Sequence, residues 1–254
     1  MVRPATPDPD HTGGGMQKSA SATLPVEGFL MKDYKRAILF ANGDFPENDS
    51  LTIEDDDFLV AVDGGLRHLL SLSLTPQLLI GDLDSVSLPD LDLCMQWGVE
   101  TMRFPTEKDE TDLEIALLEV LRRGFSDIVF TCALGDRLDH TLANLALLAH
   151  PQLKDAHVYI SNGETTVYYV SHYIELESYP GALISLLPWS EPVHGVTTTG
   201  LKYALSDSTL YPWKTVGISN LSTGDHFSVS VKSGQLFLFH ITEQSSSTRK
   251  DSND

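Results

Sequence analysis

Short apolar runs that alternate with segments of helical period constrain the fold of this chain most strongly. The alternation extends from Arg36 to Ser161 and is typical of β-strand–α-helix units that build a parallel sheet. We expect strands at 36–41, 58–62, 78–80, 99–103, 127–131 and 157–161. We expect helices at 65–73, 88–97, 111–123 and 137–149. The first half is therefore predicted to be an α/β domain.

The predicted helix at 111–123 carries the clearest local signals. Thr111 is a natural N-cap, and Glu114 three residues later completes a capping box. The apolar residues of this helix share one face: Leu113, Ala116, Leu117, Val120 and Leu121.

After Asn162 the pattern changes to strand-like pieces separated by glycine and proline, with no long helical pattern between them. The clearest pieces are Thr165 to Val170, Ala182 to Leu187, His226 to Val231 and Gln235 to His240. This texture predicts an all-β sandwich or barrel-like domain with its own core, and we favour the β-sandwich. We place the α/β catalytic domain at 32–161 and the β-sandwich domain at 162–243, with disordered segments at 1–31 and 244–254.

Charge and cysteine content restrict the partners and the compartment. The 254 residues carry 17 basic and 36 acidic side chains, a formal net charge of −19, which argues against nucleic acid or an anionic membrane as the main partner. Cys94 and Cys132 are isolated thiols and favour a reducing compartment. No secretion signal and no apolar run of about 18 residues is present, so we expect a cytoplasmic protein.

The segment Gly81-Asp82-Leu83-Asp84-Ser85 is the first candidate for chemistry. It places two carboxylates directly after the apolar run at 78–80. Mg²⁺ is usually held by one or two carboxylates together with substrate phosphates, so a strand ending here suggests a metal site and a polyphosphate substrate. Taken alone, the segment also fits an ordinary acidic turn.

Repetition favours the metal interpretation, because other predicted strands also run into aspartates. Ligands of open α/β sheets bind beyond the carboxyl ends of the strands, where these side chains converge. So many carboxylates repel one another unless a divalent cation neutralises them. The candidates are Asp44, Asp63, Asp82, Asp84, Asp109, Asp112, Asp136 and Asp139.

Phosphate groups also need donors and positive charge. Gly64, Gly65 and Gly135 precede predicted helices, whose N-terminal N–H groups bind anions, and Lys108 and Arg137 supply charge. Metal carboxylates, cations and helix N-termini are sufficient for phosphoryl transfer. Each feature also has a structural interpretation: a tight glycine turn, an ion pair of Arg137, a capped helix start at 108–112, or a local hydrogen bond of His140.

Five motifs in order resemble the thiamin pyrophosphokinase family. They are Asn42-Gly43-Asp44, Asp63-Gly64-Gly65, Gly81-Asp82-Leu83-Asp84-Ser85, Lys108-Asp109-Glu110-Thr111-Asp112 and Gly135-Asp136-Arg137-Leu138-Asp139-His140. In the second half, Thr197-Thr198-Thr199-Gly200-Leu201-Lys202-Tyr203 and Gly217-Ile218-Ser219-Asn220 resemble the thiamin-side motifs of that family. The resemblance covers about residues 36 to 240.

The resemblance implies transfer of a pyrophosphoryl group from ATP to the hydroxyethyl oxygen of thiamin, which releases AMP. It assigns Mg²⁺ to Asp82, Asp84 and Asp112, and catalysis to these three with Lys108 and Arg137. Asp112 is favoured over Asp139 as the acceptor of the thiamin proton. Nucleotide and metal binding are assigned to Asn42, Asp44, Asp63, Gly64, Gly65, Ser85, Asp109, Thr111, Gly135, Asp139 and His140.

The family resemblance also implies a homodimer in which thiamin lies between the α/β domain of one subunit and the β domain of the other. Thiamin contacts then fall to Thr199, Tyr203, Ser219 and Asn220 of the neighbouring subunit. Tyr203 stands where animal members carry Trp, and Gly135-Asp136 stands where a glycine pair is common. An aromatic ring suits the charged thiazolium and the flat pyrimidine of thiamin.

Three other functions share parts of this pattern. A related sheet with the same carboxylates can pyrophosphorylate another alcohol, such as a hydroxymethylpterin, and the β domain discriminates between the acceptors. A thiamin or nucleotide sensor without activity fits the pocket but not the complete acidic set. An Asp-nucleophile phosphatase uses an Asp-x-Asp pair, but Gly81 and Ser85 frame this pair in a different context.

Overall fold

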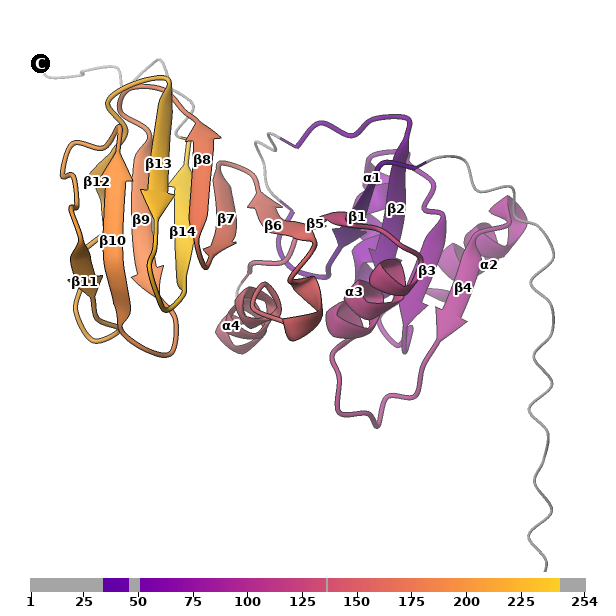
Figure 1. Ribbon diagram of the computed structural model, residues 1–254. Helices are drawn as coiled ribbons and strands as arrows, with labels where there is room; N and C mark the ends of the chain where they lie inside the picture. The colour runs from indigo at the N-terminus through magenta and orange to yellow at the C-terminus, as the bar shows by residue number, and fades with distance from the viewer. Residues whose placement is uncertain (1–33, 46–50, 136, 243–254) are drawn as a thin grey trace, which may run out of the picture. The chain divides into compact units, whose positions relative to one another are not determined.

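The computed structural model describes residues 34–45, 51–135 and 137–242 (Figure 1). Asp136 and the two segments expected to be disordered, 1–31 and 244–254, lie outside this range. The described residues form two β-sheets, one of ten strands and one of four. The ten-stranded sheet contains all the strands of the α/β half and continues into the β half.

The strands and α-helices of the α/β half agree with the sequence prediction to within two residues at every end. The strands are β1 (Arg36–Phe40), β2 (Asp57–Val62), β3 (Leu78–Gly81), β4 (Glu100–Arg103), β5 (Asp127–Thr131) and β6 (His157–Asn162). The α-helices are α1 (Leu66–Ser71), α2 (Leu88–Trp97), α3 (Asp112–Arg122) and α4 (Leu138–Leu147). Short 3₁₀ turns are η1 (Asp63–Gly65) and η2 (Pro151–Leu153).

The order of the parallel strands places the site. Strands β6, β5, β1, β2, β3 and β4 lie side by side in that order, and every neighbouring pair is parallel. The chain runs outward from β1 to β4 and then returns to β5 on the other side of β1. The strand ends diverge at this reversal, and ligands of open α/β sheets bind in the crevice that results.

Helices cover both faces of the parallel sheet, which explains its continuous apolar strands. Along β1, Leu39 belongs to one core cluster with residues of α3 and α4, whereas Ile38 and Phe40 belong to another with residues of α1 and α2. Thr111 is the N-cap of α3 and accepts a hydrogen bond from Glu114 N at 3.2 Å, as the sequence predicts.

The β half contains the four predicted strands and four more. The predicted ones are β7 (Thr165–Val170), β9 (Leu183–Pro188), β13 (His226–Ser230) and β14 (Leu236–Ile241). The additional ones are β8 (Tyr173–Glu177), β10 (Val193–Thr199), β11 (Ser208–Leu210) and β12 (Asn220–Leu221). β10 was missed because Gly195, at φ 67°, and a register shift interrupt its alternation, and β11 and β12 span only three and two residues.

Two antiparallel layers form the β half. Strands β7, β14, β9 and β12 extend the large sheet, and β11, β10, β13 and β8 form the second. Their facing side chains share a buried cluster that includes Ile184 and Leu238 from the first layer and Val196 and Phe227 from the second. This is the predicted sandwich core. Backbone pairing crosses from β6 to β7, for example at Tyr159 and Tyr168, so the sheet is continuous through the segment 162–165.

Two further predictions concern the whole chain. Cys94 and Cys132 are both buried, and no disulfide joins them, in agreement with the sequence prediction. No helix within the described ranges is long and apolar enough to cross a membrane.

Candidate active site

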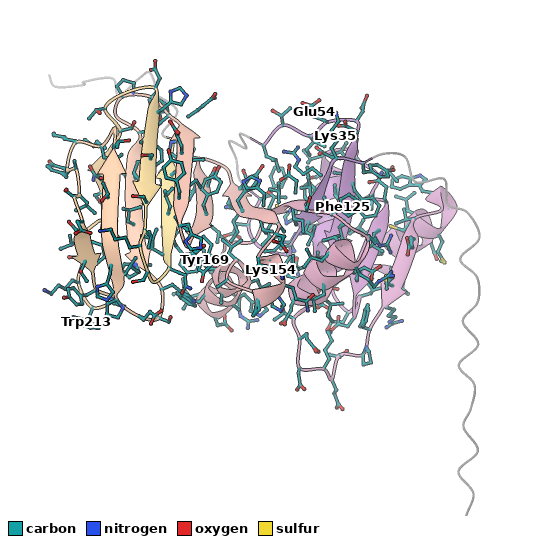
Figure 2. All side chains as sticks on the ribbon, in the orientation of Figure 1. Lys35, Glu54, Phe125, Lys154, Tyr169 and Trp213 are labelled. Carbon is teal, nitrogen blue, oxygen red and sulfur yellow. The ribbon has the colours of Figure 1, made fainter. Side chains whose placement is uncertain are left out.

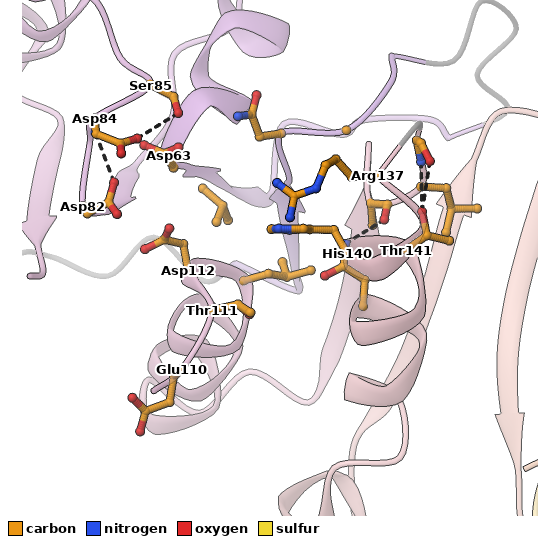
Figure 3. Close-up of a pocket in the computed structure, with 18 of the residues that line it drawn as sticks. Asp63, Asp82, Asp84, Ser85, Glu110, Thr111, Asp112, Arg137, His140 and Thr141 are labelled. Carbon is orange, nitrogen blue, oxygen red and sulfur yellow. Dashed lines mark hydrogen bonds between the residues drawn. The ribbon is translucent and has the colours of Figure 1, made fainter. Parts of the chain in front are cut away.

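A cavity of about 570 Å³ opens at the carboxyl ends of the parallel strands (Figure 3). The loops after β1, β2, β3 and β5 line it, together with the segment between β4 and α3 and the start of α4. All its lining residues lie between Asn42 and Asn144. The cavity therefore belongs to the α/β half and sits at the reversal of strand order.

Three carboxylates converge in this cavity. Ligand oxygens of Asp63, Asp82 and Asp112 lie within 4.8 Å of one another. Asp63 and Asp82 are only 8% and 9% exposed. Oδ1 of Asp63 is buried and accepts no hydrogen bond from the described residues. Burial raises the pKa of Asp112, and the nearby carboxylates of Asp82 and Asp63 add to that effect against the opposing charge of Lys108.

Glycine at position 81 permits this convergence. A Cβ at Gly81 would lie 3.0 Å from Asp63 Cβ and 3.3 Å from Asp112 Oδ1, and the backbone there has φ 146°. A side chain would therefore separate the carboxylates. Asp63 and Leu83 have φ 49° and 64°, a conformation uncommon for residues other than glycine and often associated with functional sites.

Asp84 and Ser85 lie on the rim of the cavity. Asp84 N donates to Asp82 Oδ1 at 3.1 Å, and Ser85 Oγ donates to Asp84 Oδ1 at 3.0 Å. Asp84 lines the cavity but is solvent-exposed and is not one of the three clustered carboxylates. Between the two aspartates Leu83 has a positive φ of 64°, and Asp82 is buried whereas Asp84 is exposed.

Lys108 places a positive charge among the carboxylates. Its Nζ lies 3.1 Å from Asp112 Oδ1 and 3.6 Å from Asp82 Oδ2, and it donates to Pro105 O at 3.0 Å. The side chain is only 12% exposed. Burial opposes the charge, but the contacts with Asp112 and Asp82 keep the pKa of Lys108 above its ordinary value.

The carboxylate cluster fits a hard divalent cation. It offers oxygen ligands only, which suit Mg²⁺ rather than softer metals, and one buried oxygen of Asp63 has no hydrogen-bond donor among the residues that the structure describes. A single lysine cannot neutralise three clustered carboxylates. The donor set therefore has both the chemistry and the unmatched negative charge that a magnesium ion requires.

The start of α4 lies across the cavity from the carboxylates (Figure 3). Arg137 donates to both oxygens of Asp139, at 3.0 and 2.6 Å, and this pairing lowers the pKa of Asp139. Arg137 and His140 line the cavity, whereas Asp139 does not. Gly135 N donates to Thr141 Oγ1 at 3.2 Å, so this predicted phosphate donor is used within the chain.

The glycines after β2 have a packing role. A Cβ on Gly65 would lie 1.9 Å from Phe40 O, and a Cβ on Gly64 would lie 2.5 Å from the Oδ1 atom of Asn42. Neither glycine lines the cavity, whereas Asn42 does. These glycines allow η1 to approach β1 closely and leave room for the Asn42 side chain.

The cavity brings together twelve of the predicted residues: Asn42, Asp44, Asp63, Asp82, Asp84, Ser85, Lys108, Thr111, Asp112, Gly135, Arg137 and His140. Asp109 is exposed and does not line it. Thr106, Glu110, Thr141 and Asn144 line it but were not predicted. Thr141 and Asn144 are one turn apart on α4, and this spacing on the helix after the predicted loop was the available signal.

The four predicted thiamin contacts lie in the β half and do not line this cavity. Tyr203 is 61% exposed. The side chain of Asn220 holds the backbone of Tyr203 through two hydrogen bonds: Tyr203 N donates to Asn220 Oδ1 at 2.9 Å, and Asn220 Nδ2 donates to Tyr203 O at 2.8 Å. Ser219, at φ 59°, precedes this clamp. Thr199 Oγ1 and Ser228 Oγ are 2.7 Å apart. Asn220 thus fixes the exposed Tyr203.

Two family models match consecutive parts of the chain. One described as "Thiamin pyrophosphokinase, catalytic domain" matches residues 50–160. One described as "Thiamin pyrophosphokinase, vitamin B1 binding domain" matches residues 171–236. Together they account for more than half of the chain, and they divide it near the change from the α/β half to the β half.

Individual relatives agree with the family models. The chain is 26% identical to the thiamine pyrophosphokinase of Bacillus subtilis, over 72% of this chain and 87% of that protein. It is 24% identical to thiamine pyrophosphokinase 2 of Arabidopsis thaliana, over 89% of this chain and 93% of that protein. The crystal structure of a thiamin pyrophosphokinase family protein from Enterococcus faecalis superposes with a TM-score of 0.72 at 27% identity, covering 82% of this chain and all of that one.

The carboxylate cluster predicts a metal-dependent stability. Mg²⁺ bound between Asp63, Asp82 and Asp112 relieves their repulsion in the folded state only, so Mg²⁺ is expected to raise the Tm. At about 100 times its Kd, the gain in unfolding free energy is about 2.7 kcal/mol. Calorimetry without nucleotide measures the shift.

The matched variants are Asp63→Asn, which tolerates the positive φ at this position, and Asp155→Asn on the exposed surface. Asp63→Asn is expected to raise the Tm of the metal-free protein and to remove most of the Mg²⁺ shift. Asp155→Asn is expected to do neither. Equal Mg²⁺ shifts in both variants contradict the assignment.

Proposed function

The chain belongs to the thiamin pyrophosphokinase family, and on that premise we propose how its residues carry out the reaction. The activity is transfer of the pyrophosphoryl group of ATP to the hydroxyethyl oxygen of thiamin, which gives thiamin diphosphate and AMP. The observation that carries the mechanism is the cluster of Asp63, Asp82 and Asp112 in the α/β cavity.

In this proposal the cluster holds Mg²⁺ together with the phosphates of ATP, and Asp84 on the rim completes the acidic wall. A magnesium ion held there would supply charge neutralisation of the phosphates and polarisation of the attacked phosphoryl group. Asp63 joins the ligands that the motif alone suggested, because its buried Oδ1 has no hydrogen-bond donor among the described residues. Asp82 and Asp112 keep their predicted role.

Positive groups on either side of the cavity stabilise the transferring phosphoryl groups. Lys108 lies beside Asp82 and Asp112, where the negative charge is concentrated. Arg137 stands at the N-terminus of α4, across the cavity, and the ring of His140 beside it offers a hydrogen-bond donor (Figure 3). Preorganised cations and helix N-termini lower the barrier of such transfers because they stabilise charge without reorganising during the reaction.

We assign the acceptance of the thiamin hydroxyl proton to Asp112. Asp112 lines the cavity at the start of α3, whereas Asp139 does not line it and is tied to Arg137 through both oxygens. A general base must be within hydrogen-bond reach of the proton that it removes. Geometry therefore favours Asp112.

We propose that a second copy of the chain completes the active site. Large side chains within and next to the thiamin motifs are exposed: Tyr203 by 61%, Trp213 by 71%, Val216 by 54% and Ile218 by 45%. Figure 2 shows Trp213 at the surface of the β half. Large exposed apolar side chains in one region favour a protein interface. Such an interface would bring Thr199, Tyr203 and Ser219 of one subunit to the cavity of the other, with Asn220 holding Tyr203 in place.

The proposal assigns nucleotide and metal binding to the domain at 32–161 and thiamin recognition to the domain at 162–243. The separate buried cluster of the β half supports this division. We further propose a cytoplasmic location, which Cys94 and Cys132 support because they are buried and not joined by a disulfide.

The first prediction concerns the products. Incubation with thiamin, ATP and Mg²⁺ is expected to yield thiamin diphosphate and AMP in equal amounts, because the pyrophosphoryl group moves intact. Chromatography of the nucleotides and of the thiamin esters measures both. Formation of ADP or of inorganic phosphate in place of AMP contradicts the proposed reaction.

The second prediction separates the two aspartates of the 81–85 segment. Asp82→Asn is expected to lower kcat by about 10²–10³-fold, because it removes a clustered ligand, and Asp84→Asn is expected to lower it less. Asp92→Asn, on the exposed side of α2, is the control and is expected to retain activity. Near wild-type turnover of both Asp82→Asn and Asp84→Asn removes the metal assignment.

The third prediction tests shared active sites. Asp82→Asn damages the cavity and Tyr203→Ala damages the proposed thiamin contact, so each variant alone is expected to be impaired. When the two variants are mixed one to one and exchange subunits, about half of the dimers contain one subunit of each variant. Each mixed dimer has one intact site of its two, so the mixture is expected to regain about a quarter of wild-type activity. Activity of the mixture equal to the mean of the two variants contradicts site sharing.

A further inference from the structure

Arg67 lies outside the cavity, yet it contacts the loop that forms one wall. Its guanidinium donates to Oδ1 of Asn42, to Asn42 O at 3.1 Å and to Gly43 O at 3.1 Å. Arg67 belongs to α1 and does not line the cavity, whereas Asn42 and Gly43 do. One planar side chain therefore fixes both the backbone and the side chain of this wall.

The contact with Arg67 sets the orientation of the Asn42 carboxamide. Arginine has donors only, so the carboxamide atom that faces it must be the oxygen. The two N–H donors of Nδ2 consequently point away from Arg67, and among the described residues they have no hydrogen-bond partner. Gly64 packs against the other side of the carboxamide, since a Cβ there would lie 2.5–2.6 Å from Oδ1, Cγ and Nδ2.

The backbone of the loop has additional supports that do not involve Arg67. Gly43 N donates to Cys132 O at 2.8 Å, and Asp44 N donates to Leu134 O at 3.0 Å. His68 Nε2 lies 3.0 Å from Gly43 O, and because a carbonyl only accepts, this nitrogen carries the proton. Loss of Arg67 therefore frees the Asn42 side chain more than it frees the backbone.

We propose that Arg67 is a positioning residue that aims the Asn42 N–H donors at a phosphate of the bound nucleotide. Two N–H donors at the wall of an acidic cavity are suited to an anionic oxygen and not to a cation. The inference rests on the proposed function, in which this cavity holds the phosphates of ATP. Arg67 acts only through Asn42 and touches no substrate.

Arginine suits this role because its fork reaches three acceptors at once. Lysine carries the same charge but offers a single point of contact and cannot hold Oδ1 and two carbonyl oxygens in one plane. Arg67→Lys therefore keeps the positive charge but removes the geometry by which the guanidinium holds three acceptors. Asn42→Asp keeps an acceptor for Arg67 but replaces the N–H donors with a carboxylate oxygen, which repels phosphate.

The test is the affinity for ATP with Mg²⁺, measured by calorimetry without thiamin. Arg67→Ala and Asn42→Ala are each expected to weaken ATP binding about 10-fold, the effect of losing one hydrogen bond to a charged group. The double variant is expected to match Asn42→Ala alone. Arg67→Lys is expected to fall between wild type and Arg67→Ala, and Asn42→Asp to be at least as weak as Asn42→Ala.

Wild-type affinity in Arg67→Ala overturns the proposal, and so does a double variant whose loss is the product of the two single losses, about 100-fold. Arg122→Ala on α3 is the control. Arg122 binds Glu119, and Glu119 keeps a hydrogen bond from Arg123 when Arg122 is removed, so the affinity for ATP is expected to stay unchanged. If Arg67→Ala raises the KM for thiamin as much as the KM for ATP, the proposal is also overturned, because a general loss of order in the active site affects both substrates. Binding is measured without the acceptor, so failure to form thiamin diphosphate contradicts the proposed function and leaves this coupling intact.

Discussion

The repulsion between three carboxylates in one half-buried cavity is the interaction on which the rest of the site depends. At the 4.8 Å limit that encloses the oxygens of Asp63, Asp82 and Asp112, each charged pair costs on the order of 3 kcal/mol at an effective dielectric constant of about 20. The parallel sheet imposes this cost because it ends β2 and β3 beside each other, and Gly81 allows Asp112 to approach them. Lys108 offsets only part of it. A site that concentrates negative charge in this way is suited to a divalent cation and, through that cation, to phosphate.

The other parts of the molecule are arranged around this charge. The reversal of strand order between β1 and β5 opens the cavity, and the loop at Asn42 and the start of α4 form the walls away from the carboxylates. The described cavity contains no residue of the β half. In the proposed function, recognition of the acceptor alcohol is therefore separated from the metal chemistry along the chain, and in the proposed dimer also between subunits. Such a division allows one phosphate-handling sheet to serve different acceptors through different β domains.

Most of the α/β half could be predicted from the sequence because its hydrophobic periods are long and regular. The short strands β11 and β12 could not, since two or three residues carry no period. In the site, the sequence indicated Asp82, Asp84 and Asp112 as metal ligands. The structure groups Asp63 with Asp82 and Asp112, and Asp84 lines the same cavity as an exposed residue. The internal hydrogen bond of Gly135 N and the clamp of Asn220 on Tyr203 depend on tertiary contacts that no local pattern encodes.

The most direct test of the central claim is the position of a metal in crystals of the full chain grown with Mn²⁺ in place of Mg²⁺. Anomalous scattering locates the ion independently of any activity. We expect a peak within about 2.0–2.6 Å of oxygens from Asp63, Asp82 and Asp112, the range in which hard cations meet carboxylates. A fully occupied peak elsewhere, with the three carboxylates bound only to Lys108 and solvent, contradicts the account.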